Sequence, residues 1–169
     1  VFAVTRRTRL VQGVRCTVVR DRLYLRGVLE ERTVDWYAQD RAGNVWYFGE
    51  ATAELNRDGS VKSTEGTWTA GVGGARAGIF MPAHPHRGQS GRQEYYKGHA
   101  EDHFRVVGLG RRVRTPVVSS RNALLTREWT PLEPGVVDHK LYVKGIGTVR
   151  EETVKGGDEL NVLVAIRHR

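Results

Sequence analysis

Cysteine is nearly absent from this chain: Cys16 is the only one among 169 residues, so no internal disulfide can form. Methionine occurs once, and no stretch approaches the roughly 18 consecutive apolar residues of a membrane-spanning helix. These shortages exclude a disulfide-held scaffold and a helical membrane span within the sequence. The fold therefore depends on a hydrophobic core, for which four Trp, six Tyr and four Phe supply large side chains.

A helical hydrophobic period of useful length is also missing. Apolar residues alternate with polar ones or form short β-branched runs that glycines interrupt. This pattern predicts an all-β, mostly antiparallel fold over residues 1–169 as a single domain. We expect one curved sheet, a half-barrel or a barrel of about nine to eleven strands, with at most one short helix near 92–103.

Two regions carry the strand prediction most clearly. Residues 34–39 and 45–48 are β-forming runs joined by the polar turn Asp40–Asn44, and we expect this hairpin in the middle of the sheet. Near the end of the chain, 136–143, 147–154 and 160–166 form a predicted meander with glycine-containing turns. The second sheet face of such strands must be covered or line a cavity.

Aromatic side chains gather in the central hairpin and occupy both faces of its strands. One face can fill the core, and the other either lines a cavity for an apolar small ligand or is covered by a second layer. The candidate ligand-binding residues are Trp36, Tyr37, Trp46, Tyr47, Phe48 and Trp68.

Catalytic motifs are missing as well. There is no Gly-x-Ser-x-Gly, and the glycines at 71–74 are not followed by the Gly-Lys-Ser/Thr of a phosphate-binding loop. Cys16 alternates with valines and is expected in the core. Carboxylates able to serve as acid and base are Asp35, Asp40, Glu50, Glu94, Glu101 and Asp102, but sequence spacing brings no pair of them together.

Histidines form the one pattern that suggests a divalent metal. Two of them are two residues apart, and two others are spaced i and i+4, which on a helix places both rings on one face. The candidate ligands are His84, His86, His99, His103, Glu101 and Asp102. Their order is not His-Glu-x-x-His, so no zinc-protease mechanism follows. We predict no cofactor, and a metal is the alternative.

Positive charge is concentrated in two segments of this +8 chain. Residues 1–27 have seven Arg and one Asp, and residues 103–127 have six Arg and no acid. Such segments attract an acidic protein, an anionic membrane surface or nucleic acid. The candidate docking residues are Arg6, Arg7, Arg9, Arg111, Arg112 and Arg114. No nucleic-acid-binding module is recognisable, so nucleic acid ranks last.

Four passages resemble a group of uncharacterised bacterial proteins, many of them exported. They are residues 35–50 (DWYAQDRAGNVWYFGE), 81–85, 92–96 and 128–135. Residues 142–149 are more loosely similar to exported half-barrel proteins such as lipoprotein carriers, in which a curved sheet wraps an apolar cavity. The resemblance implies export to the periplasm or the extracellular space. The initial Val1 is compatible with a removed signal peptide and equally with a shortened chain.

The leading functional hypothesis is a non-enzymatic exported β domain that binds an apolar small molecule or a protein partner. The alternatives are an accessory subunit that docks through its arginines on an acidic protein or anionic membrane, and a metal-dependent enzyme that uses the region 84–103. A steep dependence of binding on salt distinguishes docking through arginine from capture of an apolar ligand.

Overall fold

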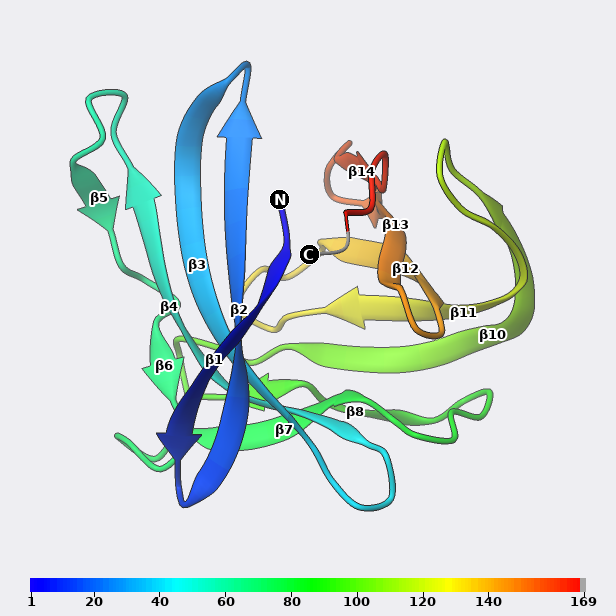
Figure 1. Cartoon of the computed structure of the whole chain (residues 1–169), viewed down its shortest axis with the longest axis horizontal. Helices are drawn as coiled ribbons and strands as arrows, with labels where there is room; N and C mark the ends of the chain where they lie inside the picture. Colours follow the sequence, from blue (N-terminus) through cyan, green and yellow to red (C-terminus); the bar gives the residue numbers. More distant parts are fainter. Residues whose placement is uncertain (168–169) are drawn as a thin grey trace. The chain divides into compact units, whose positions relative to one another are not determined.

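The structure is a computed structural model that describes residues 1–167 (Figure 1). These residues form antiparallel β-structure and contain no helix. The chain divides into two compact units. Unit 1 contains Val1–His84 and Arg92–Glu101, and unit 2 contains Pro85–Gly91 and Asp102–Arg169.

Unit 1 is built on an eight-stranded sheet in the order β1-β2-β3-β4-β7-β9, with β5 and β6 also paired to β4. The strands β1 to β4 are long, and Figure 1 shows β2 and β3 as a long twisted ribbon. The bounds are β1 Ala3–Val11, β2 Val14–Leu25, β3 Val28–Gln39, β4 Val45–Leu55, β5 Val61–Ser63, β6 Trp68–Thr69, β7 Arg76–Met81 and β9 Glu94–Tyr95.

Unit 2 is built on a six-stranded sheet in the order β14-β13-β12-β11-β10-β8. Its long hairpin β10–β11 curves along its length (Figure 1), and register shifts interrupt the pairing between Val106 and Val113. Such bulges bend a strand and increase its twist. The bounds are β8 Ser90–Arg92, β10 His103–Arg114, β11 Ser119–Trp129, β12 Val137–Val143, β13 Gly147–Lys155 and β14 Leu160–Val162.

The turn between β3 and β4 is held by the side chain of Asp40. Its carboxylate accepts hydrogen bonds from the backbone N–H and the side-chain amide of Asn44, both at 2.9 Å, and from the Trp46 indole N–H at 2.9 Å. Gly43 has a φ of +92°, which glycine adopts without strain. All of these groups are close together in the sequence, so the hairpin turn is held by hydrogen bonds among its own residues.

A bulge in β4 sets which side chains reach the core of unit 1. The pairing Tyr37↔Tyr47 changes to Asp35↔Glu50, so β4 has one extra residue in this interval. Gly49 lies in it with a φ of +134°, and a Cβ there would lie 2.4 Å from the Trp68 carbonyl oxygen. Glycine is therefore the residue that lets β6 approach β4 this closely.

Each unit has its own cluster of buried apolar residues. In unit 1 it contains Trp36, Tyr47, Phe48 and Trp68 together with Val11, Cys16, Val18, Ala70, Ala75 and Ala100. In unit 2 a smaller cluster contains Val113, Val118, Ala123 and Val149. Cys16 is fully buried, as its alternation with Val14 and Val18 predicts.

The predicted fold class is confirmed: the described chain is all-β and antiparallel, with curved sheets and neither sheet closed into a barrel. The hairpin β3–β4 lies inside its sheet, as expected. The described residues form fourteen strands, more than the sequence suggested, because strands of two or three residues such as β5, β6, β8 and β9 leave no readable alternation. The segment near 92–103 forms short strands and a turn.

Candidate functional site

A buried group of acids and aromatic rings lies in unit 1, on one face of β3 and β4. The Tyr47 hydroxyl donates to the Asp35 carboxylate at 2.7 Å, and the Trp68 indole N–H donates to Glu94 at 2.7 Å. Asp35 and Glu94 are each only 6% exposed. Burial raises the pKa of Asp35 to about 6, against the opposing effect of the Tyr47 hydrogen bond.

The rings around these acids are packed directly against one another. Tyr37 stacks on Tyr47 with ring centroids 4.7 Å apart, and Phe80 meets Tyr37 edge-on at 5.1 Å. Trp68 meets Tyr47 edge-on at 5.4 Å. At such distances the rings contact each other and fill the space between them.

The predicted ligand-binding aromatics are thus placed in or against one cluster. Four of them, Trp36, Tyr47, Phe48 and Trp68, are buried, while Tyr37 and Trp46 are partly buried. Trp46 also donates its indole N–H to Asp40, whose pKa falls to about 2 because of this hydrogen bond and those from Asn44. These contacts explain the aromatic residues as packing and turn-forming groups.

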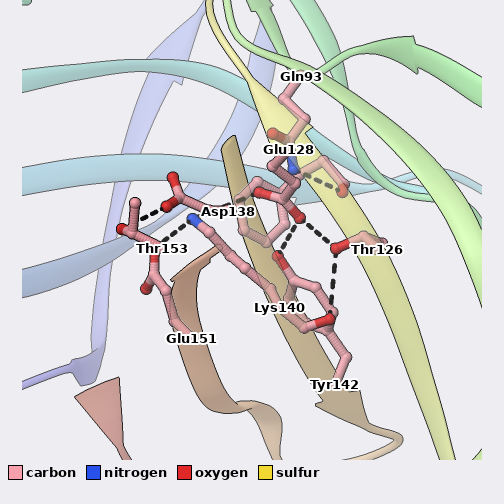
Figure 2. A network of polar contacts seen from close by, with 9 residues as sticks. Gln93, Thr126, Glu128, Asp138, Lys140, Tyr142, Glu151 and Thr153 are labelled. Carbon is pink, nitrogen blue, oxygen red and sulfur yellow. Dashed lines mark hydrogen bonds and ion pairs between the residues drawn. The ribbon is translucent and has the colours of Figure 1, made fainter. Parts of the chain in front are cut away.

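A second polar group lies in unit 2, on one face of β11, β12 and β13 (Figure 2). The register places Thr126, Lys140 and Glu151 in one row across these strands, and Glu128, Asp138 and Thr153 in the next. Side chains in directly opposed positions share a sheet face. The sequence alone does not reveal these rows, because they depend on the pairing of three strands.

Glu128 is the centre of this group. Its carboxylate is 5% exposed and accepts hydrogen bonds from the Thr126 hydroxyl at 2.7 Å and the Tyr142 hydroxyl at 2.8 Å. Lys140 lies with its Nζ 3.3 Å from Glu128 and 3.0 Å from Glu151. Figure 2 shows these side chains converging from neighbouring strands.

The carboxylates of this group keep Lys140 in its charged form. Burial alone would lower the pKa of Lys140, but attraction to Glu128 and Glu151 outweighs it and keeps the pKa well above its usual value. Burial, together with the nearby Glu128, raises the pKa of Tyr142 well above its usual value, so its hydroxyl stays a donor. The arrangement suits a fixed, hydrogen-bonded ion pair, which orients the three strands.

Arginine side chains gather on the face of β1, β2 and β3 that bears Cys16 and Trp36. The register pairs Arg9 with Cys16 and Arg22 with Arg32, and Arg20 lies two residues before Arg22 on the same strand. We call Arg9, Arg20, Arg22 and Arg32 the arginine face. All four are exposed. The Arg9 guanidinium lies 3.7 Å from the Trp36 ring centroid, so it also covers the buried indole.

The pair Arg22 and Arg32 places two like charges directly opposite each other on adjacent strands. Such pairs destabilise a sheet, and within residues 1–167 no carboxylate forms an ion pair with Arg20, Arg22 or Arg32. Guanidinium groups bind carboxylates in a bidentate geometry. The arginine face therefore presents unneutralised charge suited to an acidic partner.

Acidic residues lie on the opposite face of the same strands. Asp21 and Glu31 are sequence neighbours of members of the arginine face, Asp35 shares their face, and Glu31 is paired with Glu54 on β4. At this end of the sheet is a cavity of about 340 Å³ lined by Leu23, Glu30, Glu31, Glu54, Leu55 and Lys62. Positive and negative charge are thus separated onto the two faces of one ribbon.

The predicted docking arginines fall in both units. Arg6, Arg7 and Arg9 lie exposed on β1, and Arg111, Arg112 and Arg114 lie exposed on β10. Arg32 was missed by sequence reasoning because it follows the first arginine-rich segment, and Arg20 and Arg22 were not singled out within it. The useful signal is the spacing Arg20-x-Arg22, which places both side chains on one face of a strand.

The predicted metal ligands are distributed between the units. His84 and His99 belong to unit 1. The His99 Nδ1 atom lies 2.9 Å from the Glu65 carboxylate, and the His99 ring stacks on Tyr96. His86 and His103 belong to unit 2, where the His103 ring lies 5.5 Å from that of Trp129. The Glu101 carboxylate accepts a hydrogen bond from the Gly98 backbone N–H at 2.8 Å, and Asp102 is exposed. No three such ligands are grouped for a metal within residues 1–167.

Comparison of the chain with protein-family models, curated proteins and solved structures found no match. The part of the chain that the structure describes contains no helix long and apolar enough to cross a membrane.

Proposed function

We propose that this protein is a non-enzymatic binding module whose arginine face receives an acidic protein partner. The single observation that carries the proposal is the cross-strand pair Arg22 and Arg32, exposed and without ion-pair partners among the described residues. A like-charged pair weakens the fold slightly, and a carboxylate of a partner placed between the two guanidinium groups would remove that repulsion.

Exposed apolar residues in the same strands support a protein partner. Residues 1–25 include exposed Phe2, Val4, Leu10, Tyr24 and Leu25. Clusters of exposed apolar side chains beside arginine and tyrosine are typical of protein interfaces. In the core of unit 1 the aromatic rings contact one another directly, which disfavours an apolar small ligand bound between them.

The separation of charge also favours a protein over an anionic membrane. A flat bilayer that approached the end of the β2–β3 ribbon would meet Asp21 and Glu31 as well as Arg20, Arg22 and Arg32, because these residues lie at the same level on opposite faces. A protein can approach the arginine face alone. A second copy of this chain is disfavoured by the net charge of +8.

The test replaces Arg20, Arg22 and Arg32 together by Gln and measures binding of an acidic peptide that alternates glutamate and valine. We expect affinity to fall at least about tenfold, while the free energy of unfolding stays equal or rises because the repulsion between Arg22 and Arg32 is gone.

The matched control replaces Arg111, Arg112 and Arg114 by Gln, which removes the same charge from unit 2. This control should bind the peptide nearly as the wild type does. Equal losses in both variants would mean that the peptide responds to net charge only, and the proposal would be wrong. A clear loss of stability in the first variant would show that these arginines serve the fold.

A further inference from the structure

The geometry points to a specific mode of docking, which rests on the proposed function: an extended acidic segment of the partner adds as a strand to the exposed edge of β1. β1 is the terminal strand in the order of the unit 1 sheet and pairs with β2 alone among the described strands. An edge strand presents unpaired backbone groups that another chain can bind.

The length of β1 distinguishes it from the other strands that end a sheet. β1 has nine residues, whereas β9, β8 and β14 have two or three each. Short edge strands are a common protection against pairing with other chains. β1 does not have that protection, and it is exposed over nearly its whole length.

The side chains on the two faces of β1 determine which residue types the added strand needs on each of its own faces. On one face, Val4, Thr8 and Leu10 are exposed, with Val4 at 78% and Leu10 at 70%. On the arginine face, the small Ala3 is paired with Arg20, so the Arg20 side chain has room to extend over β1. A strand that alternates carboxylates with apolar residues would place acids on the side of Arg9 and of Arg20, which extends over Ala3, and apolar groups beside Val4 and Leu10.

The register shift between Val4 and Thr8 makes the edge selective. A bulge there interrupts the regular pairing of β1 with β2, and bulges at edges hinder indiscriminate strand addition. A partner must therefore gain from side chains on both faces as well as from backbone hydrogen bonds.

The test compares two synthetic peptides with the wild-type protein. One alternates glutamate and valine, and the other has the same sequence with N-methyl groups on alternate backbone nitrogens, which removes donors on one edge. We expect the first to bind at least about tenfold more tightly and to slow hydrogen exchange of the backbone amides of β1. Equal binding of the two peptides, without protection of β1, would overturn strand addition while docking through arginine remains.

Two exposed apolar residues of unit 1 provide a test variant and its matched control. Leu10→Ser should weaken binding of the alternating peptide several-fold without loss of stability, whereas Val72→Ser, at a residue of similar exposure (65%) in another part of unit 1, should not. An equal loss of peptide affinity in both variants would contradict the alternation of acidic and apolar residues that we infer for the added strand.

Two further outcomes separate the proposals. If the wild type does not bind the alternating peptide at all, both strand addition and the proposed function fail. If vesicles of phosphatidylglycerol bind and the peptide does not, the arginine face serves a lipid surface, and strand addition is overturned.

Discussion

Asp35 shows how a single residue links burial to pH. The carboxyl lies beside Tyr47 in the core of unit 1, and burial raises its pKa to about 6. Its acidic neighbours Asp21 and Glu31 contribute in the same direction. Their placement on one face with Asp35 follows from the register of β2 and β3.

A raised pKa means that the folded protein keeps this proton at pH values where the unfolded chain has released it. The stability that protonated Asp35 contributes is fully present below about pH 4, the pKa of an aspartate in the unfolded chain. It is lost as the pH rises through about 6, the pKa of Asp35 in the folded protein. We expect the wild type to lose on the order of 2 kcal/mol across this window. Asp35→Asn should flatten the dependence, as measured by chemical denaturation at several pH values.

Asp40 provides the control for this experiment. Its pKa is lowered to about 2 by the hydrogen bonds from Trp46 and Asn44, so its stabilising effect is present above the unfolded pKa and disappears in acid. Asp40→Asn should leave the slope between about pH 4 and 6 nearly as in the wild type. An unchanged slope in Asp35→Asn would contradict the assignment.

Lys140 is the residue on which the polar group of unit 2 depends. Lys140→Met would leave Glu128 buried without its cation, which costs about 3–5 kcal/mol for comparable buried pairs. The double variant Lys140→Met with Glu128→Gln should recover much of this loss, because the most deeply buried carboxylate of the group is then replaced by a neutral amide. Urea denaturation measures both, and a double variant less stable than the single one would refute this account.

Among the elements, strand β4 illustrates how one glycine organises several others. Gly49 lets β6 pair closely with β4 while the bulge brings Asp35 opposite Glu50. The hairpin β3–β4 was predictable from its aromatic strands and polar turn. The bulge was not, because a glycine within a strand pattern has several structural uses.

Gly49→Ala should destabilise the protein by roughly 2–4 kcal/mol, because its Cβ would collide with the Trp68 carbonyl and its φ of +134° is strained for alanine. Gly59→Ala is the control: it also has a positive φ, +84°, but its Cβ would meet nothing within 4 Å. That change should cost about 1 kcal/mol. Thermal denaturation compares the two, and equal losses would mean that the close approach of β6 is unimportant.

For the whole molecule, the distribution of charge matters more than its sum. Both arginine-rich segments have the same net charge of +6 in sequence, but only the first is folded so that arginines from β1, β2 and β3 share one face of a sheet. The exposed Val4 and Leu10 lie on the other face of β1. Docking through the arginine face should respond to ionic strength as contacts between exposed charges do.

We expect affinity for the alternating acidic peptide to fall about tenfold between roughly 0.05 and 0.2 M salt. The variant with Gln at positions 20, 22 and 32 should lose most of this dependence, and the variant with Gln at 111, 112 and 114 should keep it. Binding titrations at several salt concentrations measure both slopes. Binding that is insensitive to salt would favour the apolar-ligand hypothesis.

The sequence by itself determined the fold class, the central hairpin, the burial of Cys16 and the existence of the positive segments. These properties follow from period-two alternation, turn residues and composition, all of which are local. Only the tertiary structure decided that Arg32 joins Arg20 and Arg22, that Lys140 lies between Glu128 and Glu151, and that the chain forms two sheets. The physical reason is register: a shift of one residue moves a side chain to the other face of a sheet, and register is set by strands far apart in the chain.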